Sequence, residues 1–151
     1  MTIDEFWLEF LTATGQDKAT KYYEAFVFGG DEEMANSLLE LVLEGKKTAT
    51  SSSVPCYEVT GEPQPQVGGF SIVTDWVGEP HCVIETVAVM QLLFNEMTFD
   101  ICRREGEDEC LSTWQDGHRT FFTQDGKELG YEFTEEMPII FEDFRVVYKR
   151  K

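Results

Sequence analysis

The residues best suited to chemistry form the stretch Gly45-Lys46-Lys47-Thr48-Ala49-Thr50, which is followed by three serines, Ser51 to Ser53. In a straight strand Lys47 and Thr50 would lie on opposite faces, so they can meet only if the chain turns around Lys47. If they meet and a nonpolar pocket keeps the lysine neutral, its amine can take the proton of the Thr50 hydroxyl. Two other interpretations stay open. In the first, the lysine and hydroxyls hold an anion or a carbonyl oxygen of a ligand. In the second, the positive charge of the lysines stabilises the negative end of a helix dipole, and an ordinary edge strand follows.

A second stretch with chemical potential runs from Arg104 to Glu109 and contains four carboxylates just before a helical pattern. Carboxylates are favoured at a helix N-terminus, so most of them have a structural explanation. Trp114 and His118 follow, and their spacing of four puts them on one helical face. Trp114 is either a core residue or a surface for base stacking, and His118 is either a core histidine or a proton shuttle.

The elements that must position these residues can be read from periodicity and from glycine and proline. Helices are expected at about 2–14, 18–28, 32–44 and 111–122, the last ending near Asp125-Gly126, with a short helical turn at 99–104. Strands are expected at 48–52, 70–76, 81–89 and 139–148, and residues 59–69 are expected to form a loop. This order predicts one α+β domain over 1–151, in which a helical preface over about 1–44 precedes a small closed barrel with inserted helices over 45–151.

Composition limits the partners. Twelve Lys and Arg against 29 Asp and Glu give a net charge of −17 among 151 residues. Such a surface repels phosphate backbones, so duplex nucleic acid is not expected, whereas a small ligand in a local basic pocket is compatible with it. The chain has no apolar run of about 18 residues, so neither a membrane span nor a membrane partner is expected.

Cysteine and histidine usage points to a reducing compartment without a structural metal. The four cysteines form no C-x-x-C pair and the chain has only two histidines, so no zinc site is expected. We expect reduced thiols in a cytoplasmic protein. An N-terminus with Asp4, Glu5 and Glu9 and no basic segment does not fit a secretory signal. The sequence does not indicate an oligomeric state.

Taken together, these motifs resemble the ASCH domain family, a relative of the PUA fold. Gly45, Lys47 and Thr50 match the family motif Gly-x-Lys-x-x-Thr/Ser position by position. The longer members also share a helical preface, a Gly-Glu-Pro-x-Pro-x-Val-Gly loop (here 61–68), an acidic run before Leu-x-x-Trp-x-x-x-His-x-x-Phe-Phe, and a closing Glu-x-Phe-x-Val-Val-Tyr (here 142–148). One departure is Asp108, which replaces a glycine of the acidic run and puts in doubt any role that needs a positive φ there.

The resemblance implies a PUA-like β-barrel whose motif lines a cleft that binds RNA or a nucleobase-like ligand. Some small members of the family are amidohydrolases that remove acyl groups from modified cytidine, and some longer ones are described as ribonucleases. Carried over to this chain, the catalytic set is Lys47 as base, Thr50 as nucleophile and Glu107 as the orienting carboxylate. The expected ligand-binding residues are Gly45, Lys46, Ser52, Tyr57, Arg104, Glu105, Trp114 and His118.

Three functions follow as hypotheses. The first is a hydrolase that acts on an acylated nucleoside through Lys47, Thr50 and Glu107, without a cofactor. The second is a module that binds RNA or a nucleotide without turnover, for example a short single-stranded RNA, with Lys46, Lys47, Arg103 and Arg104 as phosphate contacts. The third is a ribonuclease, which the charge of −17 disfavours unless a divalent ion offsets the field.

Overall fold

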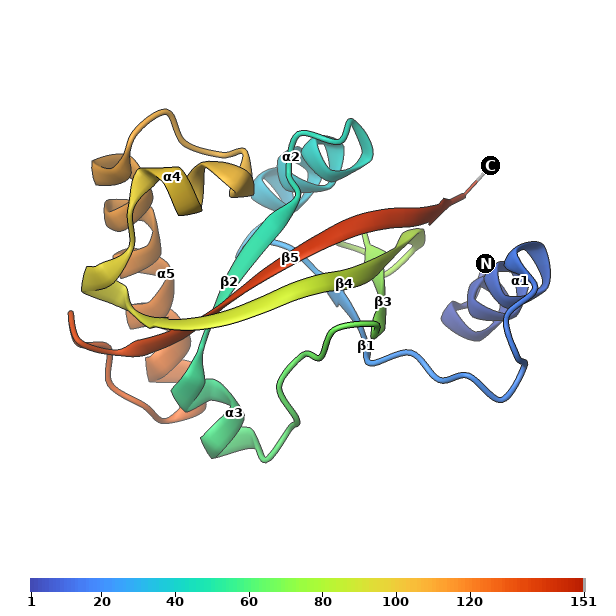
Figure 1. Ribbon diagram of the computed structural model, residues 1–151, viewed down its shortest axis with the longest axis horizontal. Helices are drawn as coiled ribbons and strands as arrows, with labels where there is room; N and C mark the ends of the chain where they lie inside the picture. The colour runs from blue at the N-terminus through green and yellow to red at the C-terminus, as the bar shows by residue number, and fades with distance from the viewer. Residues whose placement is uncertain (151) are drawn as a thin grey trace.

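The structure, a computed structural model, describes residues 1–150 and is built on one five-stranded sheet with the strand order β1-β3-β4-β5-β2. The strands are β1 (Glu24–Val27), β2 (Ala49–Ser53), β3 (Phe70–Thr74), β4 (Pro80–Leu93) and β5 (Pro138–Lys149). β1 pairs with β3 in parallel, and every other pair is antiparallel. Figure 1 shows β4 and β5 as two long strands that run through the middle of the molecule.

The sheet curls into a half-barrel instead of closing. β4 and β5 pair from Cys82 opposite Lys149 to Leu93 opposite Pro138, and irregularities in the register after Val83 and between Thr86 and Ala88 interrupt the ladder. Such irregularities increase local twist and bend the strands. β1 and β2 remain the two edges and do not pair with each other. The predicted α+β, PUA-like barrel architecture is therefore confirmed, but the closure of the barrel by hydrogen bonds was wrong.

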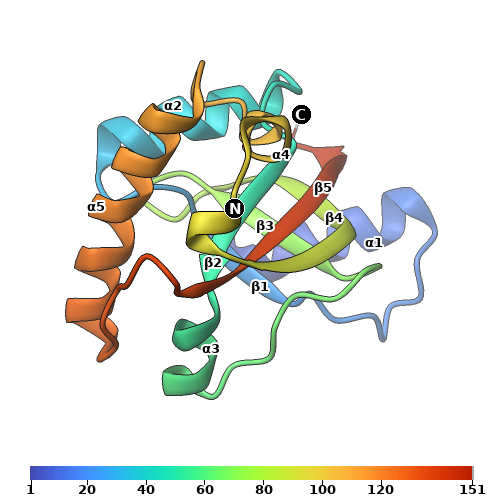
Figure 2. The ribbon, with the colours of Figure 1, turned by 60° about the vertical axis from the view of Figure 1, so that its left-hand side comes forward.

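Helices cover different parts of this sheet (Figures 1 and 2). They are α1 (Ile3–Thr14), α2 (Glu32–Leu43), α3 (Val54–Thr60), α4 (Phe99–Cys102) and α5 (Leu111–Leu129), with short 3₁₀ turns η1 at Phe94–Glu96 and η2 at Arg103–Glu105. α1 and α5 lie at opposite ends of the molecule in Figure 1. No helix within residues 1–150 combines the length and apolarity that a membrane crossing needs.

Local sequence explains most helix limits. Thr2 and Glu5 form a capping box at the start of α1, and Gly15 ends it with a φ of 71°. The Asp31 side chain accepts from the Met34 amide and caps α2. Ser53 caps α3 in the same way by accepting from the amide of Cys56.

The core consists of three groups of buried side chains, one for each large helix. α1 packs Phe6, Phe10 and Leu11 on Ile72 and Val83. α2 packs Leu39 and Val42 on β3, β4 and β5. α5 packs Trp114 and Phe122 on Phe94 and on residues of β2 and β5. All four cysteines are free thiols.

Several expected boundaries differ from the structure. Residues 18–28 do not form a helix but lead into β1, and the expected loop over 59–69 begins only at Gly61 because α3 extends to Thr60. The last helix continues beyond Gly126 to Leu129. The buried face of α2 also differs. The spacing of Met34 and Leu38 predicts that Met34 is buried, but it is 49% exposed. The buried residues of α2 are Ala35, Leu39 and Val42.

Candidate functional site

A cavity of about 420 Å³ lies where the edge strands β1 and β2 leave the barrel open. Its wall combines residues of both edges with residues of α2, α3, α5, β5 and the loop after η2. The ionisable and hydroxyl residues among its lining are Glu24, Lys47, Thr50, Ser51, Ser52, Tyr57, Glu105, Glu107, Asp108, His118 and Glu142. The unclosed edge of the sheet thus brings both sequence motifs to one cavity.

The turn that directs Lys47 into the cavity is made by the end of α2. Gly45 has a φ of 79°, and the amides of Lys46 and Lys47 both donate to the carbonyl of Leu41, at 2.9 and 3.1 Å. Such a left-handed residue after a helix is the usual place for glycine. As a result, Lys47 is only 2% exposed, while Lys46 turns outward and pairs with Glu44 at 2.9 Å. The chain therefore turns at Gly45, just ahead of Lys47, and both Lys47 and Thr50 line the cavity, without a hydrogen bond between them.

The Lys47 amine has three acceptors around it. Its Nζ donates to the Ala49 carbonyl at 2.8 Å, to Glu107 Oε2 at 2.5 Å and to Glu105 Oε1 at 3.5 Å, and it lies 5.3 Å from the centre of the Phe28 ring. Three acceptors match the three hydrogens of an ammonium group. The arrangement therefore suits a charged lysine that acts as a donor.

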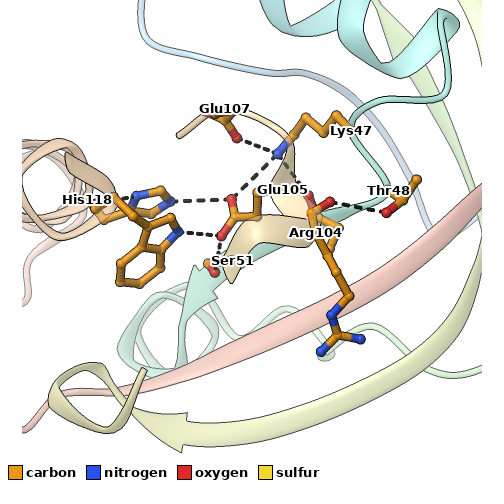
Figure 3. A network of polar contacts seen from close by, with 9 residues as sticks. Lys47, Thr48, Ser51, Arg104, Glu105, Glu107 and His118 are labelled. Carbon is orange, nitrogen blue, oxygen red and sulfur yellow. Dashed lines mark hydrogen bonds and ion pairs between the residues drawn. The ribbon is translucent and has the colours of Figure 1, made fainter. Parts of the chain in front are cut away.

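Glu105 is the centre of the network shown in Figure 3. Its Oε2 accepts from Ser51 Oγ at 2.8 Å and from Trp114 Nε1 at 2.7 Å, and its Oε1 lies 3.4 Å from His118 Nε2. Burial of this 1% exposed side chain opposes ionisation. The hydrogen bonds and charges of His118 and Lys47, with the bond from Trp114, outweigh that cost and lower the pKa of Glu105 to about 2. Glu105 is thus a fixed anion.

Glu107 behaves in the opposite way. Burial raises the pKa of its carboxyl, and repulsion from Glu105 adds to this, although Lys47 works against the shift. Its side chain is 23% exposed at the cavity wall. Of the two carboxylates on Lys47, Glu107 is therefore the one that takes up a proton more readily.

A close backbone approach brings the two carboxylates to Lys47. Gly106, between them, has a φ of 73°, and a Cβ there would lie 2.2 Å from the Lys46 carbonyl oxygen. Only glycine fits both the conformation and the space. Asp108, by contrast, has no positive φ, since no residue other than glycine does within residues 1–150. The replacement of the family glycine at Asp108 therefore leaves the backbone unstrained.

His118 and Trp114 form one stacked unit on α5. Their rings lie 4.1 Å apart at 19°, and His118 Nδ1 donates to the Trp114 carbonyl at 2.8 Å. Burial lowers the pKa of His118, but Glu105, the Trp114 carbonyl and Glu107 raise it to a net value above the ordinary one. The other side of the fully buried Trp114 ring is covered by Phe94 at 5.4 Å, so in this arrangement Trp114 offers no free face to a base.

The hydroxyls of β2 divide between the two sides of the strand. Thr50 lies opposite Glu142 of β5, Ser52 Oγ pairs with the Tyr57 hydroxyl at 2.6 Å, and Ser51 reaches Glu105. Burial, the largest cause, raises the pKa of Tyr57 and of Glu142. At the cavity mouth, desolvation followed by repulsion from Glu142 raises the pKa of Glu24 to about 7, although part of its side chain is open to solvent.

Four of the predicted ligand-binding residues do not line the cavity with their side chains, namely Gly45, Lys46, Arg104 and the fully buried Trp114. Arg104 points away from the network in Figure 3, binds both oxygens of Asp143 at 2.8 and 2.9 Å and stacks on Phe141. Lys46 is on the surface, and Gly45 acts through the turn alone. Arg104 nevertheless anchors the motif through its carbonyl, which accepts from the Thr48 amide at 3.0 Å.

Sequence reasoning missed several residues of the cavity. Strand alternation puts Ser51 on the face opposite Thr50 and gives it no predicted role, yet it holds Glu105. Glu24, Phe28 and Glu142 lie on strands or loops far along the chain from the motif and carry no local signal. Within residues 1–150, no group of three or more His, Cys, Asp and Glu side chains is placed to hold a metal ion.

Comparisons with known proteins give one family. The family model of the ASCH domain matches residues 24–148. The structure resembles the crystal structure of an ASCH domain from Lactobacillus crispatus JV V101, with 38% identity, a TM-score of 0.87 and coverage of 96% of this chain and 93% of that one. It also resembles protein EF3133 from Enterococcus faecalis V583, with 29% identity, a TM-score of 0.89 and coverage of 97% and 88%. No curated protein matches the sequence. The chain belongs to the ASCH domain family.

Proposed function

We propose that the cavity between β1 and β2 binds a nucleoside-like molecule and that the protein hydrolyses an acyl amide or ester on it. The observation that carries this proposal is the buried Lys47, held by Glu105 and Glu107 in the wall of a cavity that also presents the Thr50 hydroxyl. A positioned donor, a hydroxyl nucleophile and a buried carboxylate in one cavity are suited to acyl transfer.

The charge of the cavity favours a substrate without phosphates. Five carboxylates line it, from Glu24, Glu105, Glu107, Asp108 and Glu142, against the cationic groups of Lys47 and His118. Apolar rings from Phe28, Tyr57 and Phe121 complete the wall and suit a flat base. The volume of about 420 Å³ is in the usual range for small-molecule sites. An uncharged nucleoside meets these conditions better than a nucleotide or RNA.

The reaction assigns different roles to the polar residues. Thr50 Oγ attacks the acyl carbonyl, and the resulting oxyanion needs a donor. Lys47 Nζ supplies it by exchanging its longest contact, to Glu105 at 3.5 Å, for the substrate oxygen, while Glu107 at 2.5 Å keeps the amine in place. The three acceptors around Nζ favour this donor role over the role of base. The acylated threonine is then hydrolysed by water.

The other hypotheses receive less support. A phosphate-binding module would need cations in the cavity, but of the four expected contacts only Lys47 lines it. The other three pair elsewhere: Lys46 with Glu44, Arg103 with Asp100 and Arg104 with Asp143. The same shortage of cations weighs against a ribonuclease. The free thiols support the expectation of a reducing compartment such as the cytoplasm.

The proposal is tested by a screen of acylated nucleosides, their 5′-phosphates and short single-stranded RNAs, each with and without a divalent ion. We expect turnover of N4-acylated cytidine that does not depend on the ion. Cleavage of RNA with no turnover of any acylated nucleoside would contradict the proposal and favour the ribonuclease.

A further inference from the structure

The proposed reaction, on which this inference rests, leaves one partner unassigned. The hydroxyl of Thr50 must lose a proton as it attacks, and the Lys47 amine already donates to three acceptors. His118 and Glu105 are bonded to each other and to Trp114, with Glu105 further held by Ser51. Glu107, although it takes up a proton more readily than Glu105, is already hydrogen-bonded to the Lys47 amine. A proton acceptor for Thr50 must therefore be sought on another wall of the cavity.

Glu142 on β5 is placed for this role by the register of the sheet. Thr50 and Glu142 are directly opposite each other in the antiparallel pair β2–β5. Residues opposite one another in such a pair project to the same face, with Cβ atoms about 5 Å apart. Both residues line the cavity that also contains Lys47.

The Glu142 carboxylate is held by one oxygen and open at the other. Its Oε2 accepts from Thr86 Oγ1 at 2.5 Å, and Thr86 is itself only 4% exposed. Among residues 1–150, Thr86 is the only hydrogen-bond partner of the Glu142 carboxylate, and Thr50 Oγ1 has none. Because no buried polar side-chain atom there lacks a partner, Glu142 Oε1 and Thr50 Oγ1 are both accessible to solvent. The fixed oxygen orients the carboxylate, and the free oxygen can accept a proton.

We propose that Glu142 is a catalytic residue, the general base that takes the proton of Thr50 Oγ1. As this proton moves to Oε1, the Thr50 oxygen bonds to the acyl carbon and the carbonyl electrons move onto its oxygen. When the oxyanion collapses, the carbon–nitrogen bond breaks and Glu142 passes the proton to the leaving amine. In the second half, Glu142 takes a proton from water, the water oxygen attacks the ester, and the threonine oxygen leaves with that proton.

The surroundings of Glu142 strengthen its carboxylate as a base. Glu24 on β1, Tyr57 on α3 and Tyr23 ahead of β1 are the titratable groups that interact with it, and Lys47, Glu105, Glu107 and His118 lie in the same cavity. Burial raises the pKa of its carboxyl. A higher proton affinity makes a carboxylate a stronger base, provided that it is ionised at the working pH.

The test compares Glu142→Gln with the wild type on N4-acetylcytidine. The amide keeps an oxygen for Thr86 but cannot take a proton. We expect kcat to fall about 100-fold or more, with a small change in KM, and the acid limb of the pH profile of kcat/KM to disappear. Glu85→Gln is the matched control, because this carboxylate on β4 lies outside the cavity and pairs with the exposed Arg145.

The outcomes separate this inference from the proposed function. If Thr50→Val is inactive while Glu142→Gln keeps wild-type kcat and pH profile, the hydrolase stands and the assignment of Glu142 is overturned. If the wild type hydrolyses no acylated nucleoside, the proposed function fails and the assignment fails with it. Thermal unfolding of each variant shows whether a loss of activity reflects loss of the fold.

Discussion

At the scale of single residues, Glu105 is the group on which the site depends most. Its two oxygens contact Lys47, Ser51, Trp114 and His118. We expect Glu105→Gln to lower the free energy of unfolding by about 3 kcal/mol, because removing one member of a buried charge network leaves the others uncompensated. Denaturant unfolding measures this. Glu107→Gln is the matched control and should lower the free energy of unfolding by less, because Glu107 has a single partner and is 23% exposed.

The low pKa of Glu105 predicts the pH range in which this stabilisation is lost. Its pKa is about 2 in the folded protein and 4.5 in its ordinary state, so the unfolded chain binds the proton more tightly. The stabilisation of the fold by ionised Glu105 is therefore fully present above about pH 4.5 and disappears as the pH falls towards 2. The difference in Tm between the wild type and Glu105→Gln should shrink over this window. A difference that stays constant down to pH 2 would contradict the account.

Sequence reasoning identified the members of the site better than their contacts. The charged core of Lys47, Glu105 and Glu107 was expected from two motifs, and the structure brings these residues together. The direction of each side chain was harder to predict. Arg104 is adjacent to Glu105 in sequence, but the 3₁₀ turn η2 points their side chains to different partners. Local sequence does not determine the direction of a side chain, because the direction depends on partners in strands and helices from distant parts of the chain.

At the scale of elements, the site depends on how closely η2 approaches the end of α2. Gly106 fits against the Lys46 carbonyl with no room for a Cβ. We expect Gly106→Ala to destabilise the fold by about 2 to 4 kcal/mol, from backbone strain and overpacking together, and to move Glu105 and Glu107 away from Lys47. Gly61→Ala is the control, because Gly61 has the same φ of 73° with nothing within 4 Å. Gly61→Ala should lower the free energy of unfolding by about 1 kcal/mol. Equal losses in the two variants would show that the close approach of Gly106 to the Lys46 carbonyl is unimportant.

The element that sequence reasoning missed is β1. Residues 18–28 were expected to form a helix, but Glu24–Val27 pairs in parallel with residues of β3 that lie 47 positions further along the chain. Phe26 and Val27 have high β propensity, which favours a strand over a helix. Whether a strand forms here depends on pairing with β3, which is too far along the chain for a local pattern to reveal. The strands expected at 70–76 and 81–89 correspond to β3 and β4, which form a hairpin with a short turn, a pattern that local sequence can indicate. The error matters for function, since β1 forms one wall of the cavity.

At the scale of the whole molecule, the net charge of −17 predicts how binding responds to salt. The KM for an uncharged acylated nucleoside should be the same at about 50 mM and about 500 mM salt, because no ion pair with the ligand is screened. The 5′-phosphate of the same nucleoside should bind more weakly and improve as salt rises, because screening reduces repulsion. A phosphate ligand that binds more tightly at low salt would contradict the assignment to nucleosides.

The central claim is that a Thr50 nucleophile in the cavity between β1 and β2 hydrolyses an acylated nucleoside. The most direct measurement is kcat/KM for N4-acetylcytidine in the wild type, Thr50→Val and Thr50→Ser. Valine keeps the branched shape of threonine at the edge strand, and serine keeps the hydroxyl. The account predicts a wild-type activity that Thr50→Ser retains in part and Thr50→Val loses, with all three proteins folded. Full activity in a folded Thr50→Val variant would contradict it.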